Sequence, residues 1–168
     1  HICIAPKGFQ GQMRFNADAA VMMYCNGDQW VAMGPKEQKE WKQLDTGGWA
    51  GCALSQSGRL ACWGGTSVQQ AAVSNVPTGK RYQKLALGDS YGCALGYDGS
   101  IDCWTSNMNA DIVVNAPSGT GYTDIAAVEG SATACAITES GSLECWGSDA
   151  YNVITNLPAG NDFQNVHG

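Results

Sequence analysis

The sequence predicts an all-β protein built from tandem repeats, and three observations support this prediction. The segments CALSQSGRLACW (52–63), CALGYDGSIDCW (93–104) and CAITESGSLECW (135–146) repeat with a period of about 41 residues. Each one alternates apolar and polar residues around a central glycine, as the two strands of an antiparallel hairpin do. Six of the eight cysteines occupy equivalent positions in these segments. Each repeat therefore contains at least one predicted hairpin.

Each repeated segment is predicted to be a β-hairpin closed by a disulfide. A three-residue loop at 56–58 would place Cys52 opposite Cys62 and Leu54 opposite Leu60. Glycine is third in the loops QSG, YDG and ESG, as the left-handed position of a type I turn with a bulge requires. Directly opposed cysteines have a Cα separation compatible with a disulfide. The predicted hairpin bridges are Cys52–Cys62, Cys93–Cys103 and Cys135–Cys145.

The cysteine spacing favours disulfides over a metal or redox site. Structural zinc sites use cysteines two to four residues apart, usually with histidine, and redox pairs use Cys-x-x-Cys; neither spacing occurs here. Cys3 and Cys25 remain as a fourth candidate pair. An even number of cysteines favours an oxidising compartment, meaning an extracellular or periplasmic protein or a virion surface, and free buried thiols in a cytosolic protein are the remaining alternative. We expect no metal and no cofactor.

The repeats extend beyond the hairpins. Each opens with an aromatic residue followed three positions later by an aliphatic one, and each ends in a Pro-x-Gly motif. The predicted repeats are 41–81, 82–121 and 122–161, and Phe163 with Val166 begins a fourth. A period near 40, a recurrent tryptophan and several short strands per unit predict a propeller-type array of three four-stranded blades.

Residues 1–34 differ from the repeats and predict a small β-meander module. The segments GQMRFN, AVMMYC and QWVAMG have the composition of three short strands, and Asn26-Gly27 supplies a tight hairpin turn. A Cys3–Cys25 bridge would join the start of the module to its second strand. Residues 35–40 are charged and predict a linker to the repeats.

Charge excludes some partners. The net charge is -6, no lysine or arginine follows Lys84, and ten acidic residues lie between Asp89 and Asp162. Nucleic-acid affinity needs clustered cations, so we expect no nucleic acid partner, and anionic membranes are disfavoured for the same reason. No run of eighteen apolar residues occurs, so we expect no membrane insertion.

The repeats resemble those of the regulator of chromosome condensation propeller family. The resemblance covers 41–168 and rests on a glycine (Gly47, Gly88 or Gly130), CAL or CAI, a hairpin glycine and a strand ending in Cys-Trp. It implies a ring of four-stranded blades. Members include a chromatin-bound exchange factor and a secreted β-lactamase inhibitor. Three blades cannot close a ring, so the array is an arc of a longer protein, part of a multi-chain ring, or capped by the first module.

The segment YCNGDQWVAMG (24–34) resembles a cysteine-containing module that precedes variable domains in bacterial secreted and fibre-like surface proteins. This resemblance implies an extracellular or cell-surface location. By analogy with fibres, it also implies a homotrimer joined through residues 1–40.

Catalytic signals do not persist across the repeats. GDSYG (88–92) fits the Gly-x-Ser-x-Gly nucleophile pattern, but Ser90 aligns with Trp49 and Ala132 in the other copies. Histidine occurs only at the two chain ends, so the repeats offer Ser90 no base. We therefore predict that the protein is not an enzyme. Acidic residues around two hairpins fit either a calcium site or a solvated acidic rim: Asp98, Asp102, Glu139 and Glu144.

The loops vary while the framework repeats, which is typical of a binding scaffold. Aromatic loop residues are natural anchors and polar neighbours their partners. The candidate binding residues are Trp49, Asp89, Tyr91, Asn107, Asp149 and Tyr151. Trp63, Trp104 and Trp146 recur at one position and predict packing within or between blades. The predicted function is a non-enzymatic extracellular bacterial binding or adhesion module, similar to a fibre head, that recognises a surface glycan or protein. The alternative is a protein-binding regulator or inhibitor of an enzyme.

Overall fold

The structure is a computed structural model that describes residues 13–16, 21–25, 30–32, 41–65, 71–108 and 110–167. The chain divides into two compact units, His1–Glu40 and Trp41–Gly168. The first contains an antiparallel sheet in the order β1-β2-β3, made of β1 (Met13–Asn16), β2 (Val21–Cys25) and β3 (Trp30–Ala32). Cys25 is buried and disulfide-bonded. Its predicted partner Cys3 and the Asn26-Gly27 turn lie outside the described residues.

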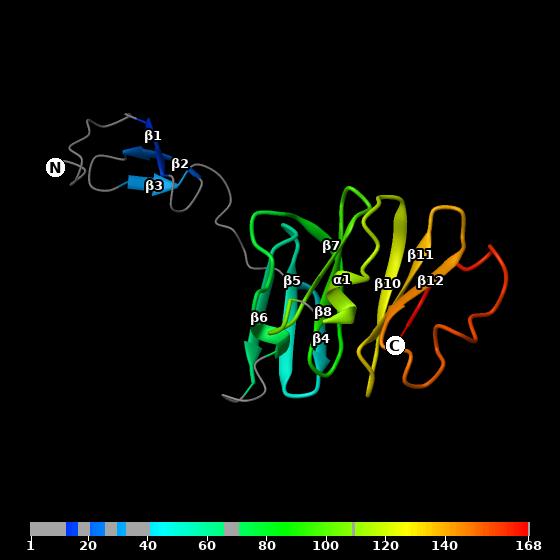
Figure 1. Cartoon of the computed structure of the whole chain (residues 1–168). Coiled ribbons are helices and arrows are strands. Elements are labelled where there is room, and N and C mark those ends of the chain that lie inside the picture. The colour runs from blue at the N-terminus through cyan, green and yellow to red at the C-terminus, as the bar shows by residue number, and fades with distance from the viewer. Residues whose placement is uncertain are drawn as a thin grey trace. The chain divides into compact units, whose positions relative to one another are not determined.

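The second unit contains three antiparallel sheets, which lie side by side in Figure 1. The first sheet is β4 (Trp41–Gly47), β5 (Ala50–Ser55) and β6 (Leu60–Gly64). The second is β7 (Tyr82–Leu87), β8 (Gly92–Gly96) and β9 (Ile101–Trp104). The third is β10 (Tyr122–Val128), β11 (Thr133–Thr138) and β12 (Leu143–Gly147). The predicted all-β class is confirmed.

The prediction of four strands per sheet is wrong for the described residues, where each sheet has three. The connections after the third strands coil instead of extending. They form the 3-10 turn η1 (Ala71–Val73) after β6 and the helical turn α1 (Asp111–Val114) after β9. In α1 the amide of Val114 donates to the carbonyl of Ala110 at 3.0 Å. Because these backbone groups bond to each other within the turn, the segment does not pair with the neighbouring strand as a fourth strand would.

The three hairpins have the predicted register. Cys52 pairs with Cys62 and Leu54 with Leu60, and the amide of Ser55 donates to the carbonyl of Arg59 at 2.9 Å. The third loop residue has positive φ in every copy: 79° at Gly58, 77° at Gly99 and 79° at Gly141. All three hairpin disulfides are present, each with a Cα–Cα distance of 4.0 Å. Local turn chemistry therefore sets the cysteines opposite each other.

Successive repeats join through one recurring hydrogen bond. The amide of the aromatic residue that opens a repeat donates to the hairpin glycine of the repeat before it. The bonds are Tyr82 N to Gly58 O (2.9 Å), Tyr122 N to Gly99 O (3.1 Å) and Phe163 N to Gly141 O (3.1 Å). The amide of Val166 also donates to the Asp124 carboxylate at 2.9 Å. Residues 163–166 thus occupy the position of a fourth repeat's first strand.

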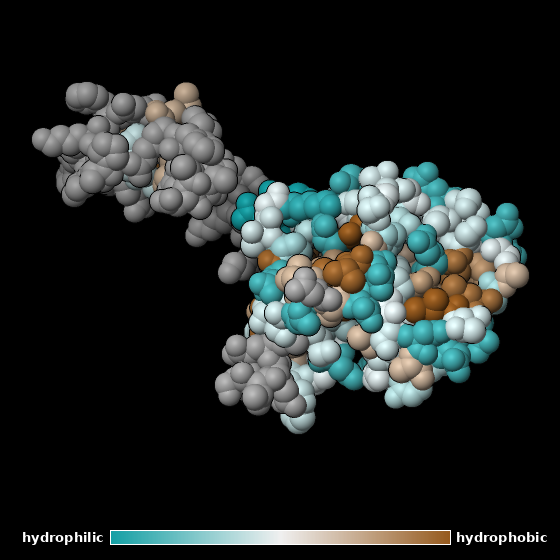
Figure 2. Space-filling view, in the orientation of Figure 1, coloured by the Kyte–Doolittle hydropathy of each residue, from teal (hydrophilic) through white to brown (hydrophobic). Residues whose placement is uncertain are grey.

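The three tryptophans that recur at one position of the repeat differ in burial. Trp104 and Trp146 are buried, and their indoles donate to the carbonyls of Ala72 and Ile112 at 2.9 and 3.1 Å. Both carbonyls belong to the connection of the preceding repeat. Trp63 is in the first repeat and is 52% exposed, so the packing prediction is wrong for this residue. Figure 2 shows hydrophobic patches that reach the surface of this unit between hydrophilic ones.

Candidate binding surface at the loop end of the sheets

Each sheet of the second unit has two ends with different loops. The hairpin end carries the loops 56–58, 97–99 and 139–141. The loop end carries the connections between first and second strands (48–49, 88–91 and 129–132) and the residues directly after the third strands (65, 105–108 and 148–155). Within each repeat a hydrogen bond of 2.8 Å joins the two kinds of loop. The three bonds are Gly65 N to Trp49 O, Thr105 Oγ1 to Ser90 O and Ser148 N to Ala132 O.

The loop ends of neighbouring repeats also touch each other. A Cβ atom on Gly47 would lie 2.3 Å from the carbonyl oxygen of Gly88, so glycine allows these two backbones to approach. The Asp89 carboxylate accepts a hydrogen bond from the amide of Gly130 at 3.0 Å. The loops of three repeats therefore form one continuous surface.

Two aromatic candidates lie open on this surface. Trp49, in the first repeat, and Tyr151, in the third, are each 67% exposed. Asp89 and Asn107 are exposed as well. Large aromatic side chains with this degree of exposure are typical anchors in protein interfaces.

Asp149 has a structural task in its own loop. Its carboxylate accepts hydrogen bonds from the amides of Ile154 (2.7 Å) and Thr155 (3.1 Å), and from the Thr155 hydroxyl. The hydroxyl bond is the main cause that lowers the pKa of Asp149 below its ordinary value. Because its oxygens already hold residues 149–155 in place, Asp149 shapes the loop that presents Tyr151.

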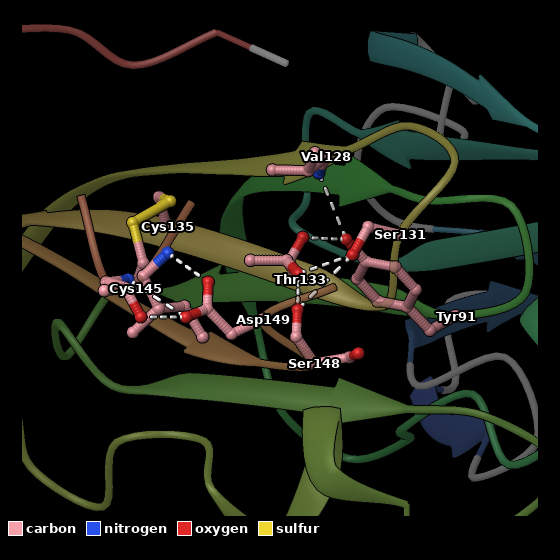
Figure 3. Close-up of a disulfide and its surroundings, with 10 residues drawn as sticks. Tyr91, Val128, Ser131, Thr133, Cys135, Cys145, Ser148 and Asp149 are labelled. Carbon is pink, nitrogen blue, oxygen red and sulfur yellow. Dashed lines mark hydrogen bonds between the residues drawn. A yellow bond between two sulfur atoms is a disulfide. The ribbon is translucent and has the colours of Figure 1, made fainter. Parts of the chain in front are cut away.

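Tyr91 does not belong to the binding surface, which corrects the sequence prediction. It is 1% exposed, and its hydroxyl donates to the carbonyl of Thr133 and accepts from the amide of Val128 at 3.2 Å (Figure 3). Burial is the main cause that raises the pKa of its phenol. Tyr91 therefore joins the second repeat to the third. Glycine at position 88 leaves room for the buried ring, because a Cβ atom there would lie 2.1 Å from Tyr91.

Lysine and arginine are absent from the loop end, whereas acidic residues lie at both ends of the sheets. Asp89, Glu129 and Asp149 lie in the loops of the loop end. All five lysines and arginines of residues 41–168 lie outside these loops: Lys42, Arg59, Lys80, Arg81 and Lys84. The loop end thus combines exposed aromatic rings with negative charge.

A cleft of about 200 Å³ lies between the first strands β4, β7 and β10 and residues 166–167. Several of its polar groups are paired with each other. The Gln43 amide exchanges two hydrogen bonds with the backbone of Leu85, and Lys84 forms an ion pair with the buried Asp124. These groups hold neighbouring repeats together. Among the residues that the structure describes, no group of three or more His, Cys, Asp or Glu side chains could hold a metal ion.

Three comparisons relate the chain to known proteins. No protein-family model matches it, and no curated protein matches its sequence. The ectodomain of the receptor kinase CR4 from Physcomitrella patens is 26% identical, with a TM-score of 0.53 over 69% of this chain and 30% of its own. The CRINKLY WD40 ectodomain of the Arabidopsis thaliana receptor kinase ACR4 is 26% identical, with a TM-score of 0.52 over 74% and 43%.

A third similar structure is yeast RCC1 (Prp20) bound to Kap60. It is 17% identical, with a TM-score of 0.52 over 79% of this chain and 36% of its own. The chain therefore spans less than half the length of these structures. Their likeness supports a propeller-type fold for the sheets described above.

The three hairpin disulfides indicate an oxidising environment. In the described residues no helix is long and apolar enough to cross a membrane.

Proposed function

We propose that this chain is a non-enzymatic extracellular module that binds a protein on another surface through the loop end of its sheets. One observation carries the proposal: the repeats bring their differing loops together on one surface, with Trp49 and Tyr151 exposed among acidic residues. A fixed framework with variable loops suits recognition, because the framework holds the aromatic anchors rigid.

The negative charge of the loop end favours a partner with a basic surface. Asp89 and Glu129 are exposed there and no lysine or arginine lies in these loops, so the surface complements a basic patch. The similar structures agree with a protein partner: CR4 and ACR4 are receptor ectodomains, and yeast RCC1 is bound to Kap60. A bacterial adhesive head, trimeric through residues 1–40, is the setting that we propose. A basic enzyme as partner would make the chain a regulator instead.

Paired variants of the whole chain test the proposal. Trp49→Ser with Tyr151→Ser removes both anchors from the loop end, whereas Leu44→Ser removes an apolar side chain that is 62% exposed in the middle of β4. We would measure binding of fluorescently labelled protein to a panel of whole cells, before and after treatment of the cells with protease or glycosidases.

We expect the double variant to lose at least about tenfold in binding, the Leu44→Ser control to bind normally, and protease to abolish the signal. Equal binding by the double variant and the wild type would refute the loop end as the site. Loss of binding after glycosidase but not after protease would replace the protein partner with a glycan.

A further inference from the structure

Basic residues gather at one place in this acidic chain. Arg59, Lys80 and Arg81 line a concavity of about 370 Å³ at the hairpin end, together with Leu60 and residues 77–79. They are three of the nine lysines and arginines in a protein of net charge -6. This basic pocket lies at the end of the sheets away from the proposed protein-binding loops.

The other repeats show that the fold does not require these cations. The hairpins align Arg59 with Ser100 and Ser142. The Pro-x-Gly motifs align Lys80 with Thr120 and Asn161, and Arg81 with Gly121 and Asp162.

The hairpin backbone at Arg59 is nevertheless the same in each repeat, whereas Gly121 has a φ of 96° that Arg81 does not share. Arg59, Ser100 and Ser142 all accept the hairpin hydrogen bond through their carbonyls, at 2.9, 2.8 and 2.9 Å. Because two repeats form this hairpin bond with serine, the hairpin itself does not require the cation of Arg59.

The pocket holds its cations in defined positions. The Arg81 guanidinium donates to the carbonyl of Ser57 at 2.5 Å, across the junction of the first two repeats. Lys80 donates to the Asp102 carboxylate at 2.8 Å and to the Ser100 hydroxyl. Its Nζ also lies 3.9 Å from the Asp98 carboxylate, so the arginines of the pocket, rather than Lys80, are its donors to an anion. An arginine has five donor hydrogens, so after one bond to a carbonyl Arg81 can still donate two hydrogen bonds to an anion.

The pocket also has open space and an aromatic neighbour. Gly79 has a φ of +85°, and a Cβ atom there would meet nothing within 4 Å. The Tyr97 ring lies beside the hairpin at Gly58, and the Tyr97 amide donates to the carbonyl of Arg81 at 3.4 Å. Lys42 adds a further cation, with its Nζ 5.5 Å from the centre of the Tyr97 ring.

We propose that the basic pocket binds the carboxylate or sulfate group of an acidic saccharide. Guanidinium groups match the geometry of both anions, and a concave site with few converging polar groups suits a compact ring bearing one charged substituent. The exposed Tyr97 ring offers an apolar face beside the cations. The site is independent of the proposed protein-binding loops, so either proposal can fail alone.

The test uses substitutions taken from the chain itself. Arg59→Ser with Arg81→Asp installs the residues of the third repeat, Ser142 and Asp162, whose backbone has no positive φ, like that of Arg59 and Arg81. The control Arg14→Ser removes a cation from β1 in the other unit. The probes are glucuronic acid, N-acetylneuraminic acid, a sulfated galactose, neutral galactose and inorganic sulfate, each titrated into the full chain by isothermal calorimetry and amide NMR.

We expect an acidic sugar to bind one site per chain and to shift the amides of residues 57–60 and 79–81. The Arg59/Arg81 variant should lose at least about tenfold in affinity, while the control keeps it. Equal affinity in that variant, or shifts confined to other residues, would refute the pocket. Inorganic sulfate binding as tightly as every acidic sugar would refute the saccharide as the ligand.

Discussion

Replacing Tyr91 by phenylalanine tests how neighbouring repeats are joined. The Tyr91 hydroxyl donates to Thr133 and accepts from Val128, so its removal leaves a carbonyl and an amide without this partner (Figure 3). A buried group that loses its partner costs about 1–3 kcal/mol. Thr133 is fully buried, whereas Val128 is half-buried and accessible to water. We therefore expect the free energy of unfolding to fall by about 1.5–3 kcal/mol.

Urea denaturation of the disulfide-bonded protein, followed by tryptophan fluorescence, measures this effect. The midpoint should move to lower urea while the slope of the transition stays unchanged. Tyr151→Phe is the matched control, because Tyr151 is exposed and its hydroxyl should contribute less than about 0.5 kcal/mol. A Tyr91→Phe protein as stable as this control would refute the assignment of Tyr91 as the residue that joins the repeats.

Three further predictions follow from the geometry. At Gly141 φ is +79° and a Cβ atom would lie 2.2 Å from the carbonyl of Asn161, so Gly141→Ala should lower the free energy of unfolding by about 2 kcal/mol or more. At Gly119 a Cβ atom would meet nothing within 4 Å, so Gly119→Ala should be neutral. Equal thermal midpoints for the two variants would contradict this prediction. Burial and the hydrogen bond to Glu144 raise the pKa of Tyr122 from 10.0 to about 12. The folded state favours the neutral phenol, so the contribution of Tyr122 to stability is complete below pH 10 and is lost as pH rises toward 12. Ultraviolet titration of the wild type against Tyr122→Phe measures this pKa, and ionisation of Tyr122 near pH 10 would contradict the prediction. Reducing the hairpin disulfides should cost about 2–3 kcal/mol per bridge, and labelling of these cysteines in the native protein would rule the bridges out.

Local features were the most predictable from the sequence. A cysteine pair of fixed spacing with glycine at the third loop position determines turn, register and bridge within one segment. The Cys52–Cys62 hairpin shows this, because each of its contacts lies between residues a few positions apart. The start of a fourth repeat at Phe163 was predictable for the same reason, since its pattern repeats an earlier one.

Contacts between repeats were not predictable from one repeat alone. Tyr91 stands in a variable loop, yet the next repeat covers it. Trp63 and Trp104 hold the same position in the pattern and differ in burial, because the connection that would cover Trp63 belongs to a preceding repeat. The basic pocket also escaped the sequence interpretation, because its cations come from a hairpin and a connection more than twenty positions apart.

The hairpin disulfides have a mechanical consequence. Each bridge spans a sequence separation of 10, and an extended chain covers about 3.3–3.6 Å per residue, so each bridge withholds about 30 Å of length from a chain under tension. None of these three bridges joins one repeat to the next. A pulling force could therefore part the repeats at their junctions and detach the first strands β4, β7 and β10, which these bridges do not hold, but it would leave each cross-linked hairpin closed. The array would lengthen in short steps, and each cross-linked hairpin would remain closed between them.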